Sequence, residues 1–188
     1  MKITVLALDP GIVNAGYSVV SARLINNKLQ YKVDETGKLK HTVYDLKQEI
    51  VEQTTGYCNE MNRLAKNYGV THCIAERFQA RGFRGHQGEG IGIMLGSLIQ
   101  MLTKEYSTEI RLVTAATWKN AFNRMADLKS FYPQVRLEPH EVDATLMALF
   151  LASSVFGIKP FEHIKSKSKQ RSLIKSIENK TTSKLKRK

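Results

Sequence analysis

The sequence predicts an α/β fold in which a mixed β-sheet carries helices on its faces. Three strand-like segments with short connections come first, which is typical of an antiparallel meander. Strand-like and helical segments alternate after them, which is typical of βα units. The chain has 188 residues, 42% of them hydrophobic, and this composition suits one domain with a real core.

The three segments of the meander are recognised by their apolar runs. Ile3–Asp9 is a short apolar run that predicts a buried strand, and Gly16–Ala22 predicts a second strand after a tight turn. Leu29–Val33 and Lys38–Val43 then flank Asp34–Gly37, which has the composition of a hairpin turn.

The rest of the chain alternates between strand and helix. Apolar spacing predicts a helix over Tyr44–Tyr68 that Gly69 ends, and a last helix from Pro139 or His140 to about Phe156. The segments between them are a strand at Val70–Ala75 closed by Glu76, a loop at Arg77–Gly90, a helix at Ile91–Tyr106, a strand at Ile110–Val113, a short helix at Thr114–Met125 and an irregular stretch at Leu128–Glu138.

Positive charge is concentrated at the C-terminal end. Residues 165–188 contain ten Lys and Arg residues against the single acid Glu178, whereas the whole chain has a net charge of +12. Such a segment suits a polyanion, because each phosphate that it neutralises releases counterions. We therefore expect a folded domain over residues 1–160 and a basic, disordered tail over residues 161–188, although a tail of this kind also fits a merely solubilising role.

Several classes of protein are disfavoured. There is no run of 18 apolar residues, so no membrane span is expected, and the first residues do not have the pattern of a secretory signal. Cys58 and Cys73 stand in apolar surroundings without a CxxC pair, which predicts reduced core residues rather than a disulfide or a zinc site. These features predict a cytoplasmic location.

Three acids follow or begin separate elements. Asp9 ends the first strand before Pro10, Glu76 ends the fourth, and Asp143 lies near the start of the last helix, three residues after His140. If the first and fourth strands are parallel neighbours, Asp9 and Glu76 emerge side by side, and a helix across that edge can bring His140 and Asp143 to them. Glu141 should point elsewhere.

Clustered carboxylates repel one another, and a hard divalent cation such as Mg²⁺ relieves that repulsion. Two such ions can promote hydrolysis of a phosphodiester. Each acid alone also fits a structural role: a turn initiator for Asp9, an ion pair with Arg77 for Glu76, and a helix-dipole partner for Asp143.

A cationic loop follows Glu76. Its arginines, Arg77, Arg81 and Arg84, are interspersed with glycines, which suits contacts with phosphate. Lys119, on the helix after the fifth strand, is a candidate phosphate ligand, and Trp118 beside it is expected in the core.

The stretches LALDPGIVNAGYSVV, CIAERFQARGFRG and HEVDATLMALF resemble the RuvC family of Holliday junction resolvases, within the RNase H-like superfamily. The resemblance spans most of Met1–Phe156. ERFQARGFRG and TWKNAF look more like a bacteriophage branch of that family, which implies the cytoplasm of a host cell.

The resemblance implies a fold, a partner and a reaction. The fold is a five-stranded sheet in the order 3-2-1-4-5, with the first three strands antiparallel and helices on both faces. The protein would be a homodimer and an Mg²⁺-dependent endonuclease, with two ions per site and Mn²⁺ as an alternative. It would resolve four-way DNA junctions, in DNA recombination and repair, by paired nicks in opposite strands.

The resemblance also implies roles for individual residues. Asp9, Glu76, His140 and Asp143 would be the catalytic and metal-binding residues, with His140 in a position where the family has His or Asp. Part of the apolar stripe on the Ile91–Tyr106 helix would join the dimer interface. The residues expected to contact DNA are Arg77, Arg81, Phe83, Arg84, Lys119, Lys165, Lys167, Lys169 and Arg171.

The position of the aromatic residue that stacks on bases is open between Phe78 and Phe83. The family places it shortly after the second acid, and neither spacing is a clean match. Three other functions remain open: a broader nuclease of forks and flaps, a junction-binding protein without catalysis, and an enzyme acting on RNA in RNA–DNA hybrids.

Overall fold

The computed structural model describes residues 1–11, 14–40, 49–77, 86–121 and 139–158. They form one five-stranded sheet in the order β3-β2-β1-β4-β5, with β1 antiparallel to β2, β2 antiparallel to β3, and β1, β4 and β5 parallel. The strands are β1 Lys2–Asp9, β2 Asn14–Ile25, β3 Lys28–Lys40, β4 His72–Glu76 and β5 Glu109–Val113. The helices are α1 Glu49–Tyr68, α2 His86–Tyr106, α3 Ala115–Ala121 and α4 Pro139–Val155.

The predicted fold class is confirmed, including the strand order and the antiparallel meander. Because β1 and β4 are parallel neighbours, their carboxyl ends lie at the same edge of the sheet. This is the arrangement that the prediction about Asp9 and Glu76 required.

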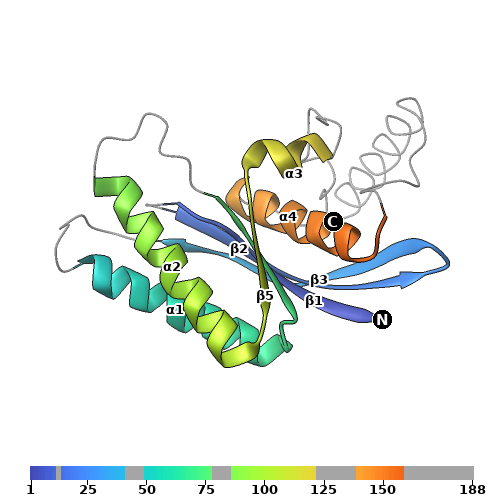
Figure 1. The fold of residues 1–188 in the computed structure, drawn as a ribbon, viewed down its shortest axis with the longest axis horizontal. Coiled ribbons are helices and arrows are strands. Elements are labelled where there is room, and N and C mark those ends of the chain that lie inside the picture. The colour runs from blue at the N-terminus through green and yellow to red at the C-terminus, as the bar shows by residue number, and fades with distance from the viewer. Residues whose placement is uncertain (12–13, 41–48, 78–85, 122–138, 159–188) are drawn as a thin grey trace, which may run out of the picture.

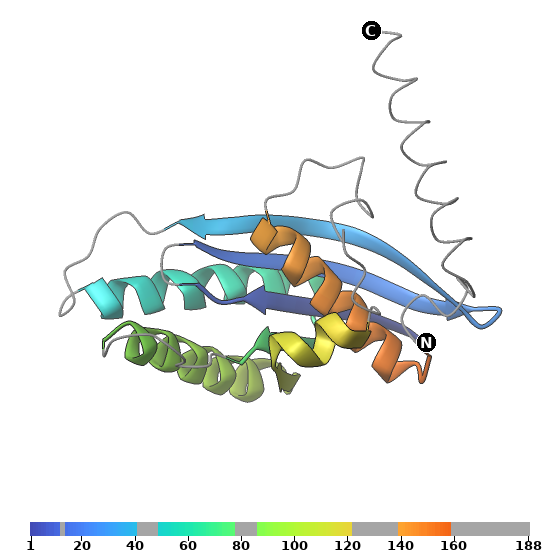
Figure 2. The ribbon, with the colours of Figure 1, turned by 90° about the horizontal axis from the view of Figure 1, so that it is seen from above.

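Two apolar cores lie on the two faces of the sheet. On one face, β1 residues such as Val5 and Ala7 pack with α4 and with Trp118 of α3. On the other, Leu6 and Leu8 pack with α1 and α2. Figures 1 and 2 show α1 and α2 running side by side, with α4 crossing the strands near α3. Alternation along β1 therefore decides which side chains meet which pair of helices.

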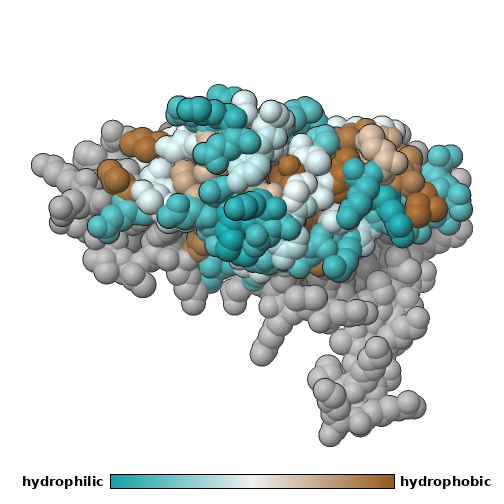
Figure 3. Space-filling model, turned by 90° about the horizontal axis from the view of Figure 1, so that it is seen from below, coloured by the Kyte–Doolittle hydropathy of each residue, from teal (hydrophilic) through white to brown (hydrophobic). Residues whose placement is uncertain are grey.

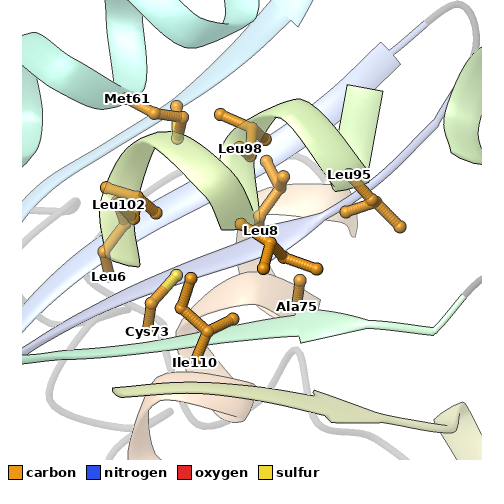
Figure 4. A pocket seen from close by; sticks show the side chains of 10 residues that line it. Leu6, Leu8, Met61, Cys73, Ala75, Leu95, Leu98, Leu102 and Ile110 are labelled. Atoms are coloured by element: carbon orange, nitrogen blue, oxygen red, sulfur yellow. The ribbon is translucent and has the colours of Figure 1, made fainter. Parts of the chain in front are cut away.

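The core beneath α1 and α2 contains a narrow apolar gap (Figure 4). Its lining includes Leu8 of β1, Met61 of α1, Leu98 of α2 and Ile110 of β5, and all of its lining residues are apolar. A gap with no polar lining offers no group to orient a polar ligand, so it belongs to the packing of the core.

The predicted turn at Asp34–Gly37 is wrong. These residues lie inside β3, and the hairpin turn is formed instead by Asn26 and Asn27, which have φ of 49° and 57°. Asparagine tolerates this left-handed region, as a two-residue hairpin turn requires. The register between β2 and β3 shifts at Val19/Val20, so Asp34 is accommodated in a β-bulge. Its carboxylate accepts a hydrogen bond from the backbone N–H of Ser21 at 3.1 Å.

Two helix ends bear on the other predictions. Gly69 ends α1 with φ of 58°, and the N–H of Val70 donates to the carbonyl of Ala65 at 3.1 Å, as in a Schellman motif. The predicted start of α2 is too late: the helix begins at His86, inside the segment expected to be a loop up to Gly90. Glycine composition alone suggests a loop there, but a helix tolerates glycine at modest cost.

Several predictions concern residues outside the described ranges. They include part of the Arg77–Gly90 loop, the irregular segment before Pro139 and the basic tail from residue 161. Both cysteines are free thiols: Cys73 is buried in the core, as predicted, and Cys58 is partly buried against it. Among the described helices, none is long and apolar enough to cross a membrane.

Candidate active site at the carboxyl ends of β1 and β4

Asp9, Glu76 and Asp143, which we call the acidic cluster, meet where β1, β4 and α4 come together. Leu8 pairs with Ala75 across the parallel strands, so Asp9 and Glu76 follow as neighbours at the strand ends. Side chains two residues apart in a strand point to the same face of the sheet. Asp9 therefore shares its face with Ala7, and Glu76 shares its face with Ile74. Both Ala7 and Ile74 pack beneath α4, so the two acids belong to the face that α4 covers. Asp143 comes from the first turns of α4.

Asp9 is held by His140. The Nδ1 atom of His140 lies 2.7 Å from an oxygen of the Asp9 carboxylate, and the Asp9 side chain is only 12% exposed. Gly11, two residues after Asp9, is anchored as well, since the hydroxyl of Tyr57 in α1 donates to the carbonyl of Gly11 at 3.0 Å. The predicted pairing of the last helix with the first strand is therefore present as a direct contact.

Glu76 is held by Trp118. The indole N–H of Trp118 donates to a Glu76 carboxylate oxygen at 3.0 Å. Trp118 is fully buried and belongs to the core beneath α4, as predicted. Its polar contact with Glu76 was not predicted, because a tryptophan at helical spacing looks the same in sequence whether or not its N–H has a partner.

Asp143 is paired with Lys119. The Lys119 ammonium lies 2.9 Å from an Asp143 oxygen and 4.8 Å from the centre of the Trp118 ring. Sequence reasoning assigned Lys119 to phosphate contact. In this structure its ammonium is paired with Asp143, and it adds a positive charge at the side of the acidic cluster.

The pKa values of Asp9 and Lys119 respond to the charges of the acidic cluster. Burial raises the pKa of Asp9 from 3.8 to about 6, against the lowering effect of the His140 hydrogen bond, and the charges of Glu76 and Asp143 raise it further. Burial works against the charge of Lys119, but its bond to Asp143 and the charges of all three acids raise its pKa. Glu76 and Asp143 are therefore close enough to act on Asp9, and all three acids are close enough to act on Lys119.

The chemistry of the cluster fits a divalent cation. Carboxylate oxygens are the ligands that Mg²⁺ prefers, and the raised pKa of Asp9 reflects, besides burial, the mutual repulsion that a cation would relieve. Within the described residues, however, no three His, Cys, Asp or Glu side chains are grouped as a ready metal site. The three carboxylates are instead bonded to His140, Trp118 and Lys119, so a cation at Asp143 would compete with the Lys119 ammonium for that carboxylate.

A close approach of β2 to α4 sets the position of His140. A Cβ built on Gly16 would lie 2.2 Å from the carbonyl oxygen of His140 and 2.7 Å from its Cβ. Gly16 pairs with Asp9 in the sheet, so the missing side chain lets the start of α4 rest directly over the end of β1. A glycine inside a strand can indicate such an approach, and this signal was available in the NAGY segment.

Two further contacts fix the rotation of α4. The Thr36 hydroxyl of β3 donates to Glu141 at 2.7 Å, and the Thr145 hydroxyl donates to Ser18 of β2 at 2.9 Å. Glu141 therefore points toward β3 and away from the acidic cluster, as predicted. His140 and Asp143 are left facing the strand ends.

The structure describes only part of the predicted DNA-contacting set. Arg77 is exposed directly after Glu76, and its backbone N–H donates to the carbonyl of Val113 at 2.6 Å. The remaining loop and tail positions lie outside the described residues: Phe78, Arg81, Phe83, Arg84, Lys165, Lys167, Lys169 and Arg171.

A five-stranded mixed sheet in the order 3-2-1-4-5, with helices on both faces, defines an RNase H-like fold. The sequence matches no protein-family model and no curated protein.

Solved structures share this fold. One is Thermus thermophilus RuvC in complex with a Holliday junction substrate, with 17% identity over 85% of this chain and 100% of that chain and a TM-score of 0.67. Another is the yeast mitochondrial Holliday junction resolvase Ydc2, with 13% identity over 95% of this chain and 83% of that chain and a TM-score of 0.52. The resemblance noted from the sequence thus extends to the fold.

Replacing Gly16 with alanine should destabilise the protein by about 1–3 kcal/mol, because the new methyl group has no room beside the His140 backbone. Urea denaturation followed by circular dichroism measures the change. The matched control is Gly56→Ala on α1, where a Cβ meets no atom within 4 Å. That change should stabilise by about 0.5–1 kcal/mol. Equal stability of the two variants would contradict the close approach.

Asp9→Asn should stabilise the metal-free protein at pH 7.5. Because the pKa of Asp9 is higher in the folded state, the folded state binds a proton more tightly, and wild-type stability falls as pH rises from about 4 to about 6. Asparagine carries no charge, so the variant should not lose this free energy of unfolding, which amounts to about 1–3 kcal/mol at pH 7.5. Urea denaturation with EDTA at pH 7.5 and pH 4 measures it, and the difference should vanish at pH 4.

Asp34→Asn is the control of opposite sign. Although partial burial opposes it, the Ser21 N–H and Lys32 lower the pKa of Asp34, so its carboxylate stabilises the fold at neutral pH. This variant should be less stable than the wild type at pH 7.5. A destabilised Asp9→Asn protein at that pH would contradict the electrostatic description of the cluster.

Proposed function

We propose that this chain is a divalent-metal-dependent endonuclease that resolves four-way DNA junctions by paired nicks in opposite strands. The observation that carries the proposal is the acidic cluster, in which Asp9 and Glu76 end parallel neighbouring strands and Asp143 reaches them from α4. The same fold occurs in RuvC bound to a Holliday junction substrate, which supports four-way junctions as the substrate class.

The proposed metal ligands are Asp9, Glu76 and Asp143, with His140 as a fourth ligand or a proton carrier. Two bound Mg²⁺ or Mn²⁺ ions would supply Lewis-acid activation of a water nucleophile and charge for the leaving oxygen. The products would carry 5′-phosphate and 3′-hydroxyl ends.

The residues around the cluster would orient these groups and handle the proton. The Nδ1 atom of His140 is bonded to Asp9, which fixes the ring and leaves Nε2 as the nitrogen that can exchange a proton with solvent or substrate. Lys119, once released from Asp143, would be a cation beside the strand ends and could contact a phosphate of the bound DNA.

DNA contact is proposed for the cationic residues that the sequence singled out. Arg77 is exposed directly after Glu76, and Arg81, Phe83 and Arg84 follow it in the chain. The basic tail would extend this surface by electrostatic attraction to the phosphate backbone.

Paired nicks require two active sites, and we propose a homodimer. The apolar stripe of α2 is used by the core, with Ile91, Met94 and Leu98 buried. The outer side of α2 instead exposes Ile93 between Gly92 and Gly96, where a partner helix could approach closely. Figure 3 shows separate apolar patches among hydrophilic side chains on the face seen from below in Figure 1.

Asp9→Asn and Glu76→Gln should each reduce junction cutting by at least about 10³-fold, because each removes a ligand charge from the proposed metal site. The assay incubates the protein with Mg²⁺ and a labelled four-way junction, and maps the nicks on sequencing gels. Three-way, flap, fork, linear and RNA–DNA hybrid substrates run in parallel. Junction binding in EDTA should be retained.

Glu141→Gln is the matched control, since Glu141 lies on the same helix but bonds to Thr36. It should cut at close to the wild-type rate.

Sedimentation velocity should give a dimer. Full activity of Asp9→Asn would refute the metal role, and a monomer that makes paired nicks would refute the dimer.

Removing residues 165–188 should weaken junction binding and flatten its dependence on salt. The removed segment contains ten of the 29 Lys and Arg residues in the chain. Each phosphate that the shortened protein no longer neutralises should reduce the slope of log K against log salt by about 0.9. Fluorescence anisotropy at several KCl concentrations measures this slope. An unchanged slope would show that the tail does not bind DNA.

A further inference from the structure

We propose that Trp118 is a positioning residue whose indole N–H fixes the Glu76 carboxylate and thereby sets the affinity of the acidic cluster for a divalent cation. This inference rests on the proposed function and concerns a residue for which sequence reasoning expected only a core role. It is carried by one contact, the 3.0 Å hydrogen bond from the Trp118 indole to Glu76.

The indole is held rigidly. Trp118 is fully buried and packs in the apolar core formed with Ile74 of β4, Val113 of β5 and α4. Its helix is anchored at its start by Thr114, whose hydroxyl accepts a hydrogen bond from the backbone N–H of Thr117 at 3.3 Å. A donor with so little freedom defines the position of the acceptor that it meets.

The contact meets a need of both partners. A buried indole N–H without an acceptor would carry a desolvation cost, and Glu76 supplies the acceptor. In return, a Glu side chain with three rotatable bonds is held in one arrangement at the end of β4. The indole engages Oε2, so the second oxygen, Oε1, is the one whose position the contact defines for a cation.

The effect on metal affinity follows from this ordering. Groups that hydrogen-bond to metal ligands orient them, and their removal typically weakens metal binding by about 10–100-fold. Trp118 also lies beside Lys119, whose ammonium is 4.8 Å from the ring centre. Two successive residues of α3 thus touch two different members of the acidic cluster, Glu76 and Asp143.

The test compares Trp118→Phe with the wild type. Phenylalanine keeps an aromatic ring in the core but has no N–H to donate. Free Mn²⁺ measured by electron paramagnetic resonance, with no DNA present, gives the dissociation constant of each protein. Trp118→Phe should bind Mn²⁺ about 10-fold more weakly while circular dichroism shows a folded protein.

The control for packing is Val113→Ala, which removes two methyl groups from the same core without touching the hydrogen bond. It should lower the melting temperature but leave the Mn²⁺ dissociation constant within about twofold of the wild type. If Trp118→Phe and Val113→Ala both lose Mn²⁺ affinity in proportion to their loss of stability, the positioning role of Trp118 is overturned. A folded Trp118→Phe protein with wild-type affinity would overturn it as well.

A second measurement uses the wild-type protein directly. Trp118 is the single tryptophan of the chain, so its emission reports on the indole next to Glu76 without background from another tryptophan. Titration with Mg²⁺ should change that emission in a saturable way, and Glu76→Gln should abolish the change. An emission that does not respond while Mn²⁺ binds would overturn the inference.

The two levels of proposal fail in different ways. If the wild type neither binds Mn²⁺ nor cuts a junction, the proposed function fails and this inference fails with it. If the wild type binds and cuts, while Trp118→Phe binds Mn²⁺ as well as the wild type, only the role of Trp118 is refuted.

Discussion

The convergence of three carboxylates at one edge of the sheet, with Asp9 buried, is the constraint on which the rest of this structure depends. Parallel pairing of β1 and β4 brings Asp9 and Glu76 to one edge of the sheet, and α4 adds Asp143. Each acid is then stabilised by a different nitrogen, from His140, Trp118 or Lys119. Burial raises the pKa of Asp9 to about 6 even though the hydrogen bond from His140 lowers it, so His140 does not fully offset the cost of burying that charge. Such an arrangement is costly for a fold alone and is typical of a functional site.

The supporting architecture serves the same edge. The absence of a side chain at Gly16 lets α4 approach β2, while Thr36 and Ser18 fix its rotation through Glu141 and Thr145. Tyr57 reaches from the opposite face of the sheet to the Gly11 carbonyl, so both helical layers contribute to the geometry around Asp9. Contacts from both faces of the sheet thus position the elements that carry Asp9 and Asp143.

Sequence patterns predicted the parts of this structure that depend on periodicity. The continuous apolar run of β1 could be read because a strand covered on both faces is apolar throughout, and the acids stood out as the charges that end such runs. The apolar stripe of α2 could be read because burial on one face of a helix imposes a repeat. Contacts between distant segments could not. The bond between Trp118 and Glu76 joins residues 42 positions apart, and no local pattern distinguishes an indole with a partner from one without.

The hairpin turn was predicted at the wrong residues because contacts between strands, which the local sequence does not show, decide where the chain turns. Asp34 and Gly37 have turn composition, but their roles are set by neighbours: a β-bulge opposite β2 for Asp34, and close packing of Gly37 against the Tyr17 ring. Asn26 and Asn27 carried the true turn signal, a pair of residues that accept positive φ. Tertiary packing therefore overrode the turn composition at Asp34–Gly37, whereas at Asn26 and Asn27 the composition and the structure agree.

The 13-residue strand β3 has a consequence for how the molecule behaves in a crowded solution. It lies at one side of the described sheet, with a neighbour only in β2, and such a strand is a template on which a foreign chain can add. Four lysines along β3, at positions 28, 32, 38 and 40, together with the irregular step at Asp34, work against that addition. We therefore expect these residues of β3 to disfavour amyloid-like self-association as well.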